Sequence, residues 1–233
     1  QPSITNDGRY VMFLSLASNL LPSDTDNVTD LYVKDMQTGQ LTLESLNYQG
    51  VKIVDSRNTG YISGDGNHIV FLSVASNVTP QRYYDPSIYV RNRQTGDITL
   101  VNVPYYTPSG NVSIESLASP SISDDGRYVA YVGRSGSVPD WSTYSQVYRY
   151  DTVTGETIRI SVSTEGLFED TSGISQYALI SGDGTSGAFS SHSNILVPND
   201  TNAKMDVFVM QFKPSTPELL APYNGAYTIL TNP

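Results

Sequence analysis

Two loops of the sequence carry acidic and amide side chains at the same spacing. The first contains Asp24, Asp26 and Asp30, and the second contains Asp200, Asn202 and Asp206. Carboxylate and amide oxygens are ligands that Ca²⁺ prefers, although both loops lack the central Gly and terminal Glu of an EF-hand. The alternative is a solvated turn in which Asp and Asn side chains bond backbone groups. Calcium is therefore one of two hypotheses for these loops.

Aromatic side chains replace the acids in the corresponding loops of the middle of the chain. These residues are Tyr83, Tyr84, Trp141 and Tyr144. Exposed Tyr and Trp rings anchor protein interfaces and can stack on sugar rings, so these four are candidate contacts to a protein or a glycan. Packing against neighbouring structural units is the alternative.

Signals for catalysis are few. The two histidines, His68 and His192, occupy corresponding places in different repeats, where a structural role is expected. The sequence has no G-x-S-x-G nucleophile elbow, no phosphate-binding loop, and no dinucleotide fingerprint in the βαβ setting that such a site requires. It contains no Cys, which excludes disulfides and thiolate chemistry. We therefore expect a protein that is not an enzyme.

Charge and hydropathy exclude two classes of partner. The formal net charge is −10, and a surface of this sign does not attract nucleic-acid phosphates. No run of about 18 apolar residues is present, so a transmembrane segment is not predicted. Charged residues make up only 15% of the chain, which suits strands and loops better than long surface helices.

A repeat that runs through the chain must position all of these loops. Its Asp-Gly turns, with glycines Gly8, Gly66, Gly126 and Gly184, follow one another at intervals of 58, 60 and 58 residues. Each turn lies between short apolar segments and predicts a hairpin, since both central residues of such a turn can adopt φ > 0. Two further segments, such as 31–34 and 41–45, complete a unit of four strands. Four antiparallel strands at a fixed period are the signature of a β-propeller blade.

The repeats resemble those of the TolB-like, WD-repeat-like β-propeller family. The resemblance rests on the Ser-x-Asp-Gly-Arg-Tyr-Val type of turn and on the stretch Tyr32-Val-Lys-Asp-Met-Gln-Thr-Gly39, and it covers residues 2–212. It implies an all-β propeller of four four-stranded antiparallel blades, at about 1–58, 59–118, 119–176 and 177–212. Propellers of this family usually have six or more blades, so four imply an incomplete ring or one completed by an oligomer.

Both ends of the repeat region are unfinished. The repeat begins at the second residue, so we expect processing or shortening upstream. Prolines after Phe212 replace the turn and fourth strand of the last unit. Residues 213–233 form a linker to another domain, fold back onto their own sheet, or donate a strand to another subunit, since an unpaired sheet edge is a template for strand addition. The candidate exchanged strand is Tyr227, Thr228, Ile229, Leu230 and Thr231.

These features predict a non-enzymatic scaffold that binds other protein subunits, copies of itself included. It is expected to be extracellular, at the cell surface or in the periplasm, and to form oligomers or filaments by sharing strands. Two alternatives are a carbohydrate-binding module that uses the aromatic loops and an accessory propeller domain of a larger secreted enzyme.

Overall fold

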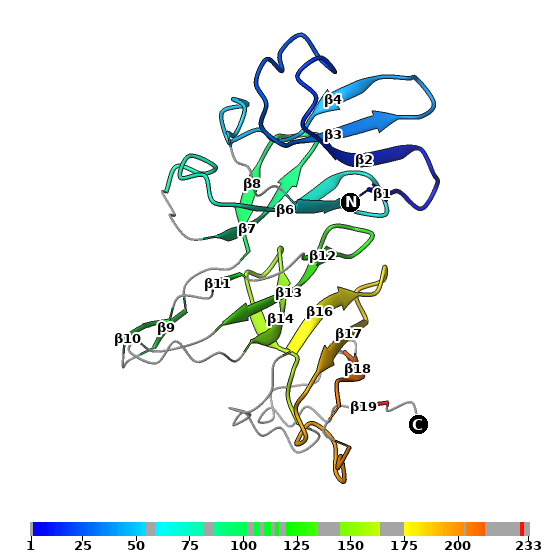
Figure 1. Cartoon of the computed structure of the whole chain (residues 1–233), viewed down its shortest axis with the longest axis vertical. Coiled ribbons are helices and arrows are strands. Elements are labelled where there is room, and N and C mark those ends of the chain that lie inside the picture. Colours follow the sequence, from blue (N-terminus) through cyan, green and yellow to red (C-terminus); the bar gives the residue numbers. More distant parts are fainter. Residues whose placement is uncertain are drawn as a thin grey trace.

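The computed structural model describes residues 2–54, 59–81, 86–101, 105–107, 110–112, 115–116, 120–134, 145–163, 175–202, 204–212 and 229–230. The regular elements in these ranges are all strands. No helix long and apolar enough to cross a membrane occurs in the described residues. The strands form four successive antiparallel sheets, with the first and last toward opposite ends of the long axis (Figure 1). The predicted fold, an all-β propeller of four blades, is confirmed.

The strands of each blade follow one another in the sheet in chain order, beginning with the strand or strands before its Asp-Gly turn. Blade 1 consists of β1 (Ser3–Ile4), β2 (Tyr10–Ser15), β3 (Asp30–Asp35) and β4 (Leu41–Leu43). Blade 2 consists of β5 (Thr59–Ile62), β6 (His68–Ser73), β7 (Ser87–Asn92) and β8 (Ile98–Leu100). Blade 3 consists of β11 (Glu115–Ser116), β12 (Ser121–Ile122), β13 (Tyr128–Arg134), β14 (Gln146–Asp151) and β15 (Thr157–Arg159). Blade 4 consists of β16 (Ser175–Ile180), β17 (Ser186–Ser191), β18 (Asp206–Gln211) and β19 (Ile229–Leu230). A separate hairpin of β9 (Tyr105–Thr107) and β10 (Gly110–Val112) lies between blades 2 and 3 in the chain.

Two blades depart from the simple four-strand plan. In blade 3, β11 and β12 both pair with β13, one near each end of that strand. In blade 4 the fourth strand comes from the C-terminal tail, where Ile229 pairs with Met210 and Leu230 pairs with Val209. The tail therefore folds back onto its own sheet in this chain; Tyr227, Thr228 and Thr231 lie outside the described residues.

The Asp-Gly turns differ from the predicted geometry. Only the glycine of each turn has a positive φ, for example +73° at Gly8, and Asp7 does not. The Asp7 carboxylate instead accepts hydrogen bonds from the Thr5 hydroxyl at 2.6 Å and from the Arg9 N–H at 2.9 Å. These side-chain bonds hold the aspartate in ordinary backbone geometry, so the turn needs left-handed backbone at one residue only.

Hydrophobic cores lie between neighbouring blades. Blades 1 and 2 share one core, blades 2 and 3 share a second, and blades 3 and 4 share a third. One stacked aromatic pair in each blade joins its two central strands, with ring centroids 5.6 Å apart: Phe13–Tyr32, Phe71–Tyr89, Tyr131–Tyr148 and Phe189–Phe208. In blades 2, 3 and 4 this pair packs in the core shared with the preceding blade, against aliphatic side chains of that blade.

The Asp-Gly turns are also joined to one another from blade to blade. The N–H of Asn6 donates to the carbonyl of Gly64 at 3.0 Å, and that of Asp65 donates to Asp124 at 2.9 Å. The Asp124 N–H donates in turn to the carbonyl of Gly182 at 2.7 Å. Each of these three backbone bonds runs from one blade to the next in chain order, which gives the row of turns a direction, and the Asn6 side-chain amide also donates to the Asp124 carboxylate of blade 3 at 2.6 Å.

Candidate functional site

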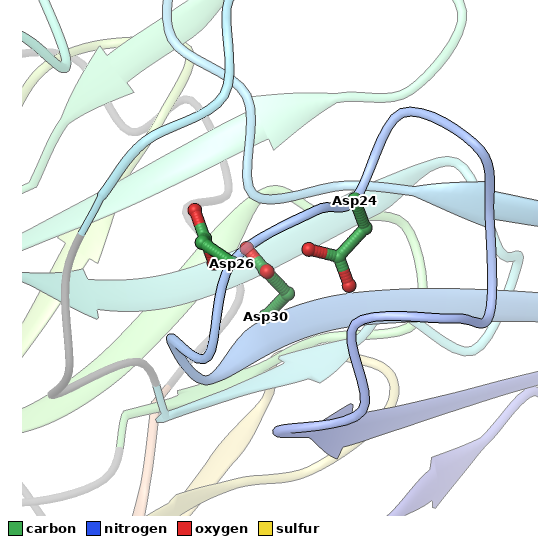
Figure 2. Close-up of side chains that lie close together, drawn as sticks. All are labelled: Asp24, Asp26 and Asp30. Atoms are coloured by element: carbon green, nitrogen blue, oxygen red, sulfur yellow. The ribbon is translucent and has the colours of Figure 1, made fainter.

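Three of the predicted acidic residues form one cluster in blade 1. Asp24 and Asp26 lie in the loop between β2 and β3, and Asp30 is the first residue of β3 (Figure 2). A carboxylate oxygen from each lies within 4.8 Å of the others. Asp24 and Asp30 are buried, so their negative charges need a compensating partner within the protein.

Lys52 supplies that partner. Its ammonium nitrogen lies 2.6 Å from Asp24 Oδ1, 2.8 Å from Asp26 Oδ1 and 2.6 Å from Asp30 Oδ2. The lysine comes from the segment after β4, which is held by a bridge between Leu46 and Lys52. The acidic loop motif did not reveal this residue, because Lys52 lies outside the loop and carries no spacing signal of its own.

Neighbouring groups fix the carboxylates in place. The Tyr32 hydroxyl donates to Asp24, and the Ser45 hydroxyl donates to Asp30 at 2.6 Å. Hydrogen bonds from Lys52 lower the pKa values of Asp24 and Asp26 below the ordinary aspartate value. Burial, together with the bond to Asp24, raises the pKa of Tyr32. Asp24 and Asp26 are therefore ionised at neutral pH, and both carboxylates share the Lys52 ammonium.

The fit to calcium is poor while Lys52 holds this position. The oxygen donors suit Ca²⁺, but the ammonium already bonds all three carboxylates that the ion would need. A calcium ion would have to displace a buried lysine and leave its charge without a partner. The geometry instead favours a structural cluster that ties the loop of blade 1 to the segment leading into blade 2.

We therefore expect the melting temperature of the purified chain to be unchanged by millimolar Ca²⁺. The measurement is differential scanning fluorimetry with Ca²⁺ and with a chelator, and Mg²⁺ serves as the control for general ionic effects. A rise in melting temperature specific to Ca²⁺ would contradict the structural interpretation of the cluster and revive the calcium hypothesis.

The second acidic loop is organised differently. The Asn202 side-chain amide donates to Asp206, at 3.2 Å to the nearer oxygen, and the Asn202 carbonyl oxygen accepts from the Lys204 N–H at 2.7 Å. Asp200 accepts from the Asn202 N–H at 3.3 Å. The two bonds that involve backbone N–H groups, together with the side-chain bond from Asn202 to Asp206, are those of a polar turn, which was the alternative to calcium. Calcium binding there stays a hypothesis. The aromatic candidates Tyr83, Tyr84, Trp141 and Tyr144 lie outside the described residues.

A candidate interaction surface lies on the last blade. We call the side of blade 4 that points away from blade 3 the blade 4 outer face; it comprises Leu179, Ala188, Val207 and Val209. Val207 is 67% exposed and Leu179 is 58% exposed. The residues at the place of Val207 in the other blades are Leu31, Ile88 and Val147. All three are fully buried, because a following blade covers them. The blade 4 outer face therefore has the composition of a core surface, and no blade covers it in the part of the chain that the structure describes.

Solved structures resemble the chain in fold. TolB from Acinetobacter baumannii matches with a TM-score of 0.51 at 18% identity, over 99% of this chain and 43% of its own. Oligogalacturonate lyase from Vibrio parahaemolyticus matches with a TM-score of 0.53 at 13% identity, over 91% of this chain and 48% of its own. The tricorn protease matches with a TM-score of 0.52 at 13% identity, over 91% of this chain and 18% of its own.

These comparisons establish a TolB-like β-propeller fold. The chain spans less than half the length of each of the three proteins. No family model matches the sequence, and no curated protein sequence gives a significant match. A fold of this kind serves many functions, so a function must be argued from the surfaces of this chain.

Proposed function

We propose that this chain is a non-enzymatic scaffold that works through protein–protein contacts, contacts with copies of itself included. The observation that supports the proposal is the blade 4 outer face, where Val207 and Leu179 are exposed on a surface of core composition. Apolar surface gathered on one face marks a protein-interaction site more often than scattered exposed residues do. A chain without Cys fits the extracellular or periplasmic location that we propose for it.

The C-terminal strand gives self-association a specific route. In this chain β19 completes blade 4 through two residue pairs, with Met210 and Val209 of β18. An exchanged oligomer would contain the same two pairs between chains, because a swapped element keeps its contacts. The strand-sharing hypothesis therefore predicts that oligomers depend on Ile229 and Leu230.

The expected result for the wild-type chain is a mass above that of the monomer in multi-angle light scattering, rising with protein concentration. The double variant Ile229→Pro/Leu230→Pro removes the backbone donors of β19 and tests the route. Loss of oligomers in this variant would support strand sharing, and their retention would contradict it. A wild-type chain that stays monomeric at every concentration would overturn the proposal of self-association.

A further inference from the structure

A second unpartnered sheet face lies at the other end of the chain. We call the side of blade 1 that points away from blade 2 the blade 1 outer face; its apolar members are Ile4, Val11, Phe13, Leu41 and Leu43. Ile4 is 59% exposed, and the other four are half-buried. None of the five belongs to any of the three inter-blade cores in the described chain.

The two outer faces correspond to the two sides of the interface between neighbouring blades, which occurs three times within the chain. Within the chain, the face with the stacked aromatic pair always packs against the aliphatic face of the preceding blade. The blade 1 outer face contains such a pair, Phe13–Tyr32, in which Tyr32 is fully buried and Phe13 is half-buried, and no blade among the described residues packs against it. The blade 4 outer face is aliphatic, and no blade among the described residues packs against it. Blade 1 therefore presents the aromatic-pair face of an inter-blade interface, and blade 4 presents the aliphatic face.

The hydrogen bonds between the Asp-Gly turns have the same polarity. Blade 1 donates from Asn6 to blade 2, and blade 3 donates from Asp124 to blade 4. Among the described residues, the Asn6 carbonyl accepts no bond from another turn, and the blade 4 turn donates none onward. One end of the row therefore offers a free acceptor and the other a free donor, which suits head-to-tail continuation.

We propose that a second copy of this chain packs its blade 1 outer face onto the blade 4 outer face of the first. The proposal rests on the self-association proposed above, and it assigns that association to the two outer faces as an alternative to strand sharing. This contact is heterologous, so two copies close a ring if the rotation permits and otherwise grow into a filament. Two copies of four blades make eight, which is within the range of closed propellers. The pairing leaves β19 within its own chain.

Two single-face variants test the proposal when they are mixed. Ile4→Lys disables the blade 1 outer face and Val207→Lys disables the blade 4 outer face. Both side chains are exposed, so the monomer should fold, which circular dichroism verifies. Each variant alone is expected to associate at least tenfold more weakly than the wild type, since the lysine introduces a charge into an apolar contact. An equimolar mixture is expected to recover dimers, because it contains one intact face of each kind. Light scattering and native mass spectrometry measure all four samples.

The possible results distinguish a failure of the proposed contact surfaces from a failure of self-association itself. Val153→Lys, a change at a 74% exposed residue in the turn between β14 and β15, is the matched control and should associate like the wild type. Wild-type oligomers that persist in both single-face variants would overturn the proposed surfaces while leaving self-association intact. Loss of association in Val207→Lys alone, or a mixture without dimers, would also overturn head-to-tail packing. A wild-type chain that stays monomeric would overturn both proposals.

Discussion

Replacing Gly126 by Ala is expected to destabilise the chain by about 2–5 kcal/mol, as measured by urea unfolding. Gly126 has φ +75°, and a Cβ there would overlap Nδ1 and Cγ of His68 in blade 2 and lie 2.8 Å from its Cε1. The contact reaches the root of the imidazole ring, so His68 can yield only by changing its rotamer in the space between two blades. The loss therefore combines backbone strain with overpacking between blades 2 and 3.

Gly8 provides the matched control for this experiment. It occupies the same turn in blade 1 with φ +73°, but nothing lies within 4 Å of the position that a Cβ would take there. Gly8→Ala should therefore cost only the left-handed backbone penalty, about 1–2 kcal/mol. Equal losses in Gly8→Ala and Gly126→Ala would mean that the inter-blade contact contributes nothing to stability.

Replacing Lys52 by Met is expected to destabilise the chain by about 3 kcal/mol, because removal of one partner leaves buried carboxylates without their counter-charge. For a chain of this size the melting temperature should fall by about 6–12 °C. Lys204→Met is the control, since Lys204 is an exposed lysine with no ion pair among the described residues. Equal losses in the two variants would show that the acidic cluster does not need its lysine.

The effect of Lys52→Met should depend on pH in a defined direction. The pKa values of Asp24 and Asp26 lie below their ordinary value of 3.8 because of hydrogen bonds from Lys52. A carboxyl group with a lowered pKa stabilises the fold above its unfolded pKa and loses that contribution as the pH falls through the folded value. The difference in melting temperature between wild type and Lys52→Met is therefore expected to be large at pH 7 and to shrink below about pH 4. A constant difference down to pH 2 would contradict this coupling.

The architecture could be predicted because it depends on short-range signals that recur. The Asp-Gly turns and their flanking apolar segments report local backbone preferences, and their period of about 58 residues implies identical units. The Asp-Gly pair also predicted a positive φ for both central residues of the turn. That prediction was wrong for the aspartate, because the Thr5 or Ser side chain before it supplies hydrogen bonds that keep the aspartate in ordinary geometry.

The site could be predicted only in part, since its decisive contacts are non-local. Asp24, Asp26 and Asp30 were found from their spacing, but Lys52 reaches them from beyond the fourth strand of the blade. In the sequence alone, Val207 likewise has the pattern of an ordinary strand residue. Its exposure becomes informative only beside Leu31, Ile88 and Val147, which occupy the same place in blades that have a covering neighbour.

The arrangement of the cores has a consequence for how the chain unfolds. Each core belongs to one pair of neighbouring blades, so cooperativity passes mainly from one blade to the next, with one further side-chain bond from Asn6 of blade 1 to Asp124 of blade 3. The two inner blades share a core on each side, whereas blades 1 and 4 share one core each. Loss of a terminal blade removes one interface and exposes the next, so partial opening is expected to begin at the end blades before the whole chain unfolds. A partner that covers an end blade would suppress the partial opening of that blade, and the chain would then unfold in a single cooperative transition.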